Sequence, residues 1–264
     1  MLKPGEKNVL AVEVHQAGPK SSDLYFDLAI KTLPTETAAA EVSSDVRDVV
    51  EMFNRRHYVG PETRIPDGYL DGGRGMKIDD ENRAAAGREM LQVDRSRDSE
   101  LADDLALARS AALRELPPLE RAKRIAAWID SETTPPAGKR LVEKTTAQLE
   151  QEFKNRPLLI GDWVEQCHAG VCRHRALLFK ILADEAGLKT ALVRGNYGRD
   201  KKPGFPHAWN ELFLDDGRRL LVDVMHHGGE DKFFDVGAPE VVEHYWKVDD
   251  TPWYATKPAD APTK

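Results

Sequence analysis

Three residues that could carry out acyl transfer follow one another in the sequence. Cys172 opens a segment typical of a helix, and His207 and Asp223 lie in two apolar segments typical of neighbouring strands. A thiol nucleophile, an imidazole base and a carboxylate that orients the base form the catalytic unit of cysteine-dependent acyl transfer. These three residues are therefore our candidate catalytic triad.

The surroundings of Cys172 favour the thiolate that this chemistry needs. A free thiol has a pKa of about 8.5, so the site must stabilise the anion. The macrodipole at a helix N-terminus does so, and Arg173 and Arg175 add positive potential. Gly170 would let a substrate backbone approach closely. The alternative is a buried structural cysteine, the usual environment of an isolated cysteine.

The relative orientation of His207 and Asp223 depends on the turn between strands that we expect at residues 207–214 and 218–225. The sequence Asp-Asp-Gly at 215–217 favours a three-residue loop, in which a type I turn is followed by a left-handed glycine. The resulting pairs are Leu214 with Arg218, Trp209 with Asp223, and His207 with Met225. His207 and Asp223 then lie on one face as diagonal neighbours, whereas a two-residue loop would place them on opposite faces.

His207 and Asp223 differ in how well a purely structural role explains them. His207 could be an ordinary strand histidine. Asp223 lies within the apolar sequence Leu-Leu-Val-Asp-Val-Met, where a carboxylate needs a polar partner. The imidazole N–H of His207 is a natural partner, and Asp223 would then fix the tautomer and stabilise the imidazolium.

Acyl transfer also needs hydrogen-bond donors for the oxyanion. The backbone N–H of Cys172 is one candidate. Gln166, in the preceding loop, could supply a side-chain amide, although it could equally be a surface glutamine. Trp163 is a second candidate for the same wall of the site.

The cysteines and histidines of this region allow two other interpretations. The residues Cys167, His168, Cys172 and His174 could form a metal cluster, completed by the histidine pair at 226–227. Structural zinc sites usually join two separated ligand pairs, and this tight cluster lacks a clear distant half. A disulfide between the two cysteines would disable the nucleophile. We therefore expect no metal and no cofactor.

The elements around these residues are mostly amphipathic helices. We expect helices at 45–55, from Ser99 to the break at Pro117-Pro118, at 119–131, at 141–155, and from Cys172 to about Ala186, where Gly187 ends the last one. The second would bury Leu101, Leu105, Ala108 and Ala112. A strand is expected at 190–194. Residues 58–98 predict a long irregular segment with one helical piece near 83–91, and the chain after Gly229 predicts irregular, aromatic-rich structure. The domain is therefore predicted to be α+β, with helices first and then a small antiparallel sheet packed on the Cys172 helix.

Composition limits the function further. The chain has 264 residues, of which 41% are hydrophobic, and a net charge of −7, which argues against a nucleic-acid partner. No apolar run is long enough to span a membrane. The start shows no secretory signal, but a secreted or periplasmic protein stays compatible if the natural N-terminus lies further upstream. Compartment and oligomeric state remain open.

The motifs resemble a known superfamily. Gly-Val-Cys172-Arg-His, His207-Ala-Trp209 and Val222-Asp223 resemble the transglutaminase-like superfamily, which has a papain-like cysteine fold. More narrowly, the segment from Cys172 to Asp184, with Leu221-Val-Asp223, is similar to the peptidase-like domain of plant ethylene-response Raf-like kinases and of some armadillo-repeat proteins. The similarity spans roughly residues 101–229. It implies a Cys-His-Asp triad at Cys172, His207 and Asp223.

The resemblance leaves two classes of function open. One is a cysteine peptidase, amidase or transglutaminase-like enzyme that acts on a peptide or isopeptide bond of a protein or peptide substrate. The other is a non-catalytic interaction module on the same fold. The plant kinase domains lack the His-Ala-Trp block that this chain has, which favours activity. No protein-kinase signature occurs in this chain.

The first 30 or so residues resemble a different fold. Their sequence is similar to that of the closing strands of a galactose-binding-like jelly roll, although they could also form a hairpin on the main domain. We therefore divide the chain into closing sandwich strands at 1–34, a linker and irregular segment at 35–98, a transglutaminase-like domain at 99–256 and a disordered tail at 257–264.

Overall fold

The computed structural model describes residues 42–133, 151, 154, 157–167, 170–198, 202–225 and 231–254. The chain divides into two units, Met1–Thr37 and Ala38–Lys264. The predicted sandwich strands, the predicted tail, and all of the predicted helix at 141–155 except residues 151 and 154 lie outside the described residues. The domain boundaries from the sequence therefore stay a prediction.

The main sheet has antiparallel neighbours throughout, in the order β1-β7-β8-β9-β10, with β11 also paired to β7. Its two long central strands are β7 (Lys189–Tyr197) and β8 (Phe205–Phe213). The shorter strands are β1 (Tyr58–Val59), β9 (Arg219–Val222), β10 (Phe233–Asp235) and β11 (Tyr245–Trp246). β7 is longer than the predicted strand at 190–194 because its C-terminal half pairs with both β8 and β11.

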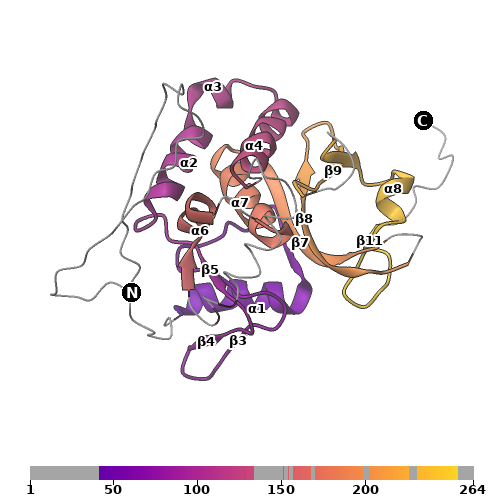
Figure 1. The fold of residues 1–264 in the computed structure, drawn as a ribbon. Helices are drawn as coiled ribbons and strands as arrows, with labels where there is room; N and C mark the ends of the chain where they lie inside the picture. Colours follow the sequence, from indigo (N-terminus) through magenta and orange to yellow (C-terminus); the bar gives the residue numbers. More distant parts are fainter. Residues whose placement is uncertain are drawn as a thin grey trace, which may run out of the picture. The chain divides into compact units, whose positions relative to one another are not determined.

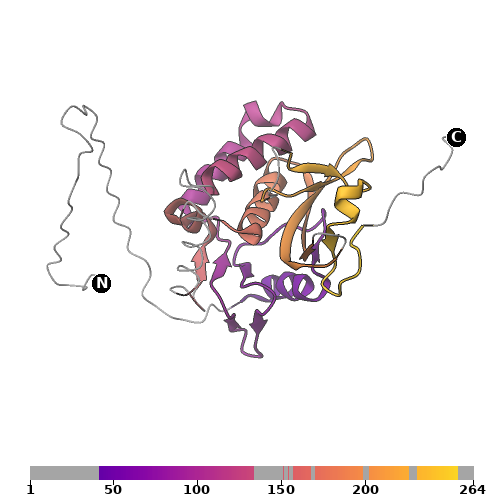
Figure 2. The same cartoon turned by 45° about the vertical axis from the view of Figure 1, so that its right-hand side comes forward.

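Helix α7 (Cys172–Glu185) lies between this sheet and the helices α2 (Ser99–Arg109) and α4 (Pro118–Thr133), as Figures 1 and 2 show. Contacts on both sides bury nearly every residue of α7 after its first. The helix ends as predicted, since Gly187 adopts the left-handed conformation with φ of 78°. The mixed α+β class is thus confirmed.

The start and end of α2 differ from the prediction. Asp98, not Ser99, caps the helix: its Oδ1 accepts from the Leu101 N–H at 3.0 Å. The helix ends at Arg109, because Ser110 caps a separate short helix, α3 (Ala111–Arg114). The expected burial of Ala112 is therefore wrong; it is exposed and Leu113 is buried instead.

The segment before α2 is built from short strands. After α1 (Ser44–Arg56), which the sequence predicted, come β1, β2 (Leu70–Asp71), β3 (Lys77–Ile78), β4 (Ala84–Ala85) and β5 (Met90–Gln92). The helical piece predicted near 83–91 is therefore wrong. β5 pairs antiparallel with β2 and parallel with β6 (Pro157–Leu159), and these distant partners override local propensity. α6 (Ile160–Cys167) follows directly.

The hairpin of β8 and β9 has the predicted register, but β9 ends at Val222, so the expected strand pairs of Trp209 with Asp223 and of His207 with Met225 are not part of the ladder. Asn210 pairs with Val222 and Phe213 with Arg219, and the Leu214 N–H donates to the Arg218 carbonyl at 2.9 Å. Gly217 has φ of 83°, as the three-residue loop requires. His207 and Asp223 therefore lie on one face of the hairpin.

The chain after Gly229 is not irregular as predicted. It forms β10, the short helix α8 (Pro239–Val242) and β11. Its aromatic residues complete a core cluster with Trp209, which is fully buried and packs against Tyr245 with ring centroids 5.1 Å apart. This cluster closes the side of the sheet on which His207 lies, and the folding of this segment is therefore coupled to the site.

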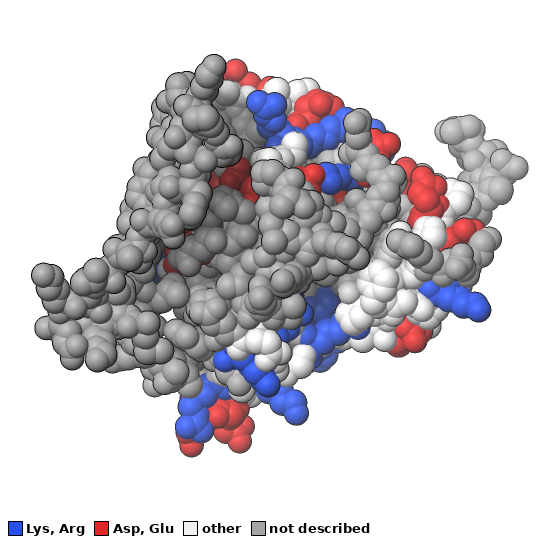
Figure 3. All heavy atoms as spheres, in the orientation of Figure 1, with Lys and Arg blue, Asp and Glu red and all other residues white. Residues whose placement is uncertain are grey.

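The surface carries both signs of charge. On the face shown in Figure 3, acidic and basic side chains are intermixed over the described residues. No described helix combines the length and apolar character needed to cross a bilayer.

Candidate active site

His207 and Asp223 are in direct contact. The imidazole Nε2 lies 2.7 Å from Asp223 Oδ2, and both side chains are buried. β8 positions His207, and Asp223 follows the last residue of β9, where its backbone N–H donates to the Lys232 carbonyl. Because Nε2 is engaged by the carboxylate, Nδ1 is the ring nitrogen left for another partner.

Asp223 accepts hydrogen bonds from His207, Tyr245 and Met225. Its Oδ2 receives the His207 Nε2 and the Tyr245 hydroxyl, the latter at 2.8 Å, and its Oδ1 receives the Met225 N–H at 3.1 Å. These donors hold the carboxylate in one orientation and compensate for its burial. The role of Tyr245 was not predicted from the sequence. The sequence showed an aromatic-rich segment, but it gave no sign that this segment pairs with β7.

Cys172 is a free, partly buried thiol at the first position of α7. Burial opposes its ionisation, but the charge of His207, a hydrogen bond with the His207 side chain and one with the Ala208 backbone together lower the pKa of the thiol. Burial likewise opposes the imidazolium, yet Asp223 and Cys172 raise the pKa of His207 to about 10. These opposite shifts favour a thiolate–imidazolium pair beside a carboxylate.

The first turn of α7 is fixed by His174. Its Nδ1 accepts from the Val171 N–H at 3.0 Å, so its Nε2 carries the proton and donates to Glu89 at 3.1 Å. Burial and the neighbouring Arg173 lower the pKa of His174 to about 4, which keeps the ring neutral. Trp163, proposed from the sequence as a wall of the site, instead stacks on His174, with centroids 4.8 Å apart.

Arg175 connects the start of α7 to the end of the hairpin. Its Nε donates to the Gly170 carbonyl at 2.7 Å, and Nη1 donates to the Val224 carbonyl at 3.4 Å. A second Nη1 contact joins it to Asp130 on α4. The buried Arg175 side chain thus links the loop before Cys172 to the residue after Asp223 by hydrogen bonds to their backbone carbonyls.

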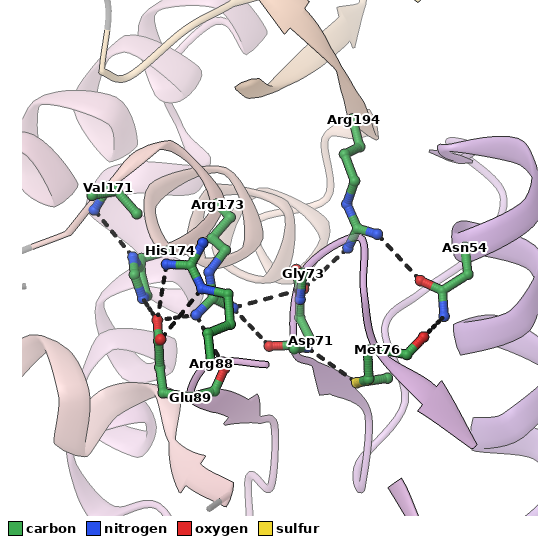
Figure 4. Close-up of polar contacts among 11 residues, drawn as sticks. Asn54, Asp71, Gly73, Met76, Arg88, Glu89, Val171, Arg173, His174 and Arg194 are labelled. Atoms are coloured by element: carbon green, nitrogen blue, oxygen red, sulfur yellow. Dashed lines mark hydrogen bonds and ion pairs between the residues drawn. The ribbon is translucent and has the colours of Figure 1, made fainter. Parts of the chain in front are cut away.

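Arg173 belongs to a second network, drawn in Figure 4. It pairs with Glu89 and donates to the Asp71 carbonyl at 2.7 Å. Arg194 on β7 donates to Asp71 Oδ1 at 3.0 Å, and Arg88 contacts Glu89. Burial opposes the carboxylate, but the hydrogen bond from His174 and the charges of Arg173 and Arg88 lower the pKa of Glu89 to about 2. The segment before α2, which was predicted to be mostly irregular, therefore supplies both carboxylates behind the first turn of α7.

Two hollows both have Cys172 in their lining. One, of about 170 Å³, is lined mainly by aromatic and apolar side chains: Val171, Tyr197, Phe205, Pro206, Met225 and the site residues themselves. The other, of about 320 Å³, is lined by glycines and arginines from the segment before α2, by α7, and by the start of β8. A substrate bound across the cysteine would fill both.

The remaining sequence candidates are placed as follows. Gln166 lies on α6, not in a loop as predicted, and its side chain is outside the described residues. Both ring nitrogens of His174 are committed to protein partners, which leaves none for a metal. Among the described residues, no group of three or more possible ligands could hold a metal ion, while His168 and the Cys167 side chain are not described.

Comparisons with known proteins agree with the resemblance read from the sequence. The family model described as EDR1/CTR1/ARMC3, peptidase-like, matches residues 76–231. The human Armadillo repeat-containing protein 3 is 35% identical over 95 residues, which are 31% of this chain and 10% of that protein. The Arabidopsis thaliana Probable serine/threonine-protein kinase SIS8 is 40% identical over 60 residues, 23% of this chain and 6% of that protein. The chain therefore spans about a tenth or less of the length of these curated relatives.

A solved structure, the periplasmic domain of TgpA from Pseudomonas aeruginosa, is similar to 63% of this chain at 16% identity, with a TM-score of 0.32 and 67% of that chain covered. The family model spans more than half of the 264 residues. The chain belongs to the EDR1/CTR1/ARMC3 peptidase-like family.

Proposed function

We propose that this domain is a cysteine-dependent acyl-transfer enzyme on a transglutaminase-like, papain-like fold, acting on a peptide or isopeptide bond. The observation that carries the proposal is the contact of His207 with Asp223 on one side and its hydrogen bond with Cys172 on the other. His207 therefore lies between Cys172 and Asp223. This arrangement supports the roles of nucleophile, base and orienting carboxylate for the three residues.

The first half-reaction forms a thioester. The Cys172 thiolate attacks the carbonyl carbon, a C–S bond forms, and the carbonyl π electrons move to oxygen. The backbone N–H of Cys172 at the helix N-terminus, and the Gln166 amide, are the candidate donors for that oxyanion. As the oxyanion collapses, the C–N bond breaks and the His207 imidazolium gives its proton to the departing amine.

The second half-reaction releases the acyl group. Neutral His207 takes a proton from a water molecule, whose oxygen attacks the thioester carbon. The C–S bond breaks, the carboxylic acid leaves and the thiolate–imidazolium pair is restored. An amine in place of water would give transfer instead of hydrolysis.

The test is the pH dependence of Cys172 alkylation by iodoacetamide. It uses a Cys167→Ser background and compares the parent with His207→Ala. We expect an inflection below the free-thiol value that moves upward by a unit or more in His207→Ala, because the imidazolium that lowers the pKa of the thiol is gone. Folding of both proteins is checked by circular dichroism.

An ordinary profile in both proteins would contradict the enzymatic proposal. The same result would favour a non-catalytic interaction module. In the two curated relatives the matching region forms a tenth or less of the whole protein, as a module within a longer chain would.

A further inference from the structure

The larger hollow beside Cys172 is bounded by cations. Four of its lining residues are arginines, and no described lining residue is acidic: Gly72, Gly73, Arg74, Gly75, Gly87, Arg88, Val171, Cys172, Arg173, Arg194, Pro206, His207 and Ala208. The carboxylates that pair with three of these arginines, Asp71 and Glu89, are buried behind this lining. Three of the four guanidinium groups therefore pair with these two carboxylates, and Arg74 pairs with neither.

Arg74 is the arginine whose charge is least compensated. Among the described residues, no carboxylate lies within ion-pair distance of it, and Asp250 acts on it only at longer range. Its Nη2 donates to the Gly195 carbonyl, and Gly195 is paired with His207 across β7 and β8. Its Nε is buried without a hydrogen-bond partner in the structure. The guanidinium is thus held beside β8, which carries His207, and not all of its N–H donors have a partner in the protein.

The loop that carries Arg74 is fixed in shape. Gly73, with φ of 80°, donates its N–H to Asp71 Oδ1 at 2.7 Å, and the same oxygen accepts from Arg194. A Cβ placed on Gly75 or Gly87 would meet nothing within 4 Å, so these walls are bare backbone beside open space. Extended substrate backbone could lie there with a side chain pointing to the arginines.

We propose that this hollow, which we name the arginine subsite (Arg74, Arg88, Arg173 and Arg194 with the glycines around them), binds an acidic side chain next to the acyl group that Cys172 attacks. The inference rests on the proposed function and assigns its substrate class: a peptide or isopeptide with Asp or Glu beside the reacting bond. Guanidinium groups recognise carboxylates by charge and by paired N–H donors. The opposite hollow, with Phe205 56% exposed, would accept an apolar group.

The test compares alkylation of Cys172 by iodoacetate, which is anionic, with alkylation by neutral iodoacetamide. The ratio of the two rates cancels the thiolate fraction, so it does not depend on whether His207 activates the cysteine. In a Cys167→Ser background we expect Arg74→Gln to lower the iodoacetate-to-iodoacetamide ratio about tenfold, because one nearby positive charge is lost. Arg74→Lys should retain most of the ratio.

The matched control is Arg218→Gln on the β8–β9 turn, an exposed arginine paired with Asp216, which should leave the ratio unchanged. A ratio in Arg74→Gln equal to that of the parent and the control would overturn the arginine subsite, whatever the pH profile shows about the triad. Conversely, an ordinary pH profile with a ratio that depends on Arg74 would contradict the proposed enzyme and keep the subsite.

A second experiment identifies the source of the carboxylate by protection of Cys172 from iodoacetamide. The probes are N-acetylglutamate α-amide, N-acetylglutamine amide and N-acetylglycine. Protection that is strongest with the glutamate derivative, and lost in Arg74→Gln, supports an acidic side chain. Protection by N-acetylglycine alone would overturn that assignment in favour of a chain-terminal carboxylate, and equal protection by the glutamine derivative would overturn charge recognition.

Discussion

Replacement of Asp223 by Asn tests the electrostatic basis of the site. The pKa of His207 rises from 6.5 to about 10, which corresponds to about 5 kcal/mol of preferential stabilisation of the imidazolium. Asp223 and Cys172 are the two charges responsible. Burial acts against these two charges, so together they supply more than this net amount. Loss of the Asp223 charge is expected to remove about 2 kcal/mol or more, which is roughly 30-fold or more in the population of the thiolate–imidazolium pair.

The amide adds a second, geometric effect. The hydrogen bonds from His207, Tyr245 and Met225 place two donors on Asp223 Oδ2 and one on Oδ1. Asn has a single acceptor oxygen, so in either orientation its NH₂ faces at least one donor. An orientation that points the NH₂ at His207 Nε2 would also move the imidazole proton to Nδ1, where it faces the thiol and prevents proton acceptance. One buried donor without an acceptor costs about 1–3 kcal/mol of folding free energy.

The assay is iodoacetamide alkylation against pH, with Asp216→Asn on the exposed turn as the matched control. We expect the inflection in Asp223→Asn to rise by more than one pH unit and the rate at pH 6 to fall about 30-fold or more. The free energy of unfolding should fall by a few kcal/mol without loss of the fold. A folded Asp223→Asn protein with an inflection equal to that of Asp216→Asn would refute the reasoning.

Three further predictions concern the elements that hold the site. The pKa of His174 is about 4 in the folded protein and 6.5 in the unfolded chain, so the unfolded chain binds a proton first as the pH falls. The free energy of unfolding should therefore fall by about 3 kcal/mol between pH 6.5 and pH 4. His174→Asn should reduce this pH dependence in urea titrations. Glu89→Gln removes the nearer of the two carboxylates that pair with buried Arg173 and leaves only Asp71 Oδ1 at 3.7 Å, so it should cost about 3–5 kcal/mol in urea unfolding. Glu81→Gln, which breaks an exposed pair with Arg83, should cost less than about 1 kcal/mol; equal losses would contradict the network in Figure 4. Asp98 accepts hydrogen bonds from the Leu101 N–H of α2 and the Gly161 N–H of α6. Asp98→Ala should therefore lower the free energy of unfolding by about 1–3 kcal/mol, whereas Ser99→Ala should change it by less than about 0.5 kcal/mol. A larger effect of Ser99→Ala would indicate that Ser99 is the helix cap.

The parts of the structure that the sequence predicted well are those determined by local chemistry. The β8–β9 register followed from one turn, since a glycine in the left-handed position specifies the loop length and the loop length specifies which residues share a face. The α7 boundaries followed from Gly187 and from the run of helix-forming residues after Cys172. This sharing of a face in the hairpin predicted that His207 and Asp223 lie together, as their contact shows.

The parts that could not be predicted depend on partners far away in the sequence. Residues 83–91 have no apolar period of their own, and β5 exists because β2 and β6 lie on either side of it. Tyr245 reaches Asp223 only because β11 pairs with β7. Arg173 was expected to add open positive potential at the cysteine, yet Glu89 and Asp71 hold it from behind, and neither stood out in a segment rich in glycine and charge.

The long-range contacts of the α7 first turn also have a kinetic consequence. Arg173 reaches back 84 residues to Glu89 and 102 residues to Asp71, and Arg194 reaches back 123 residues to Asp71. Closing such loops is slow because conformational entropy of the chain is lost before the contacts that stabilise the closed loop can form. The hairpin that joins His207 to Asp223 spans only 16 residues and can form early. Thiol reactivity should therefore appear last during refolding, so that a chain emerging from the ribosome would present an inert cysteine until the whole domain has closed around it.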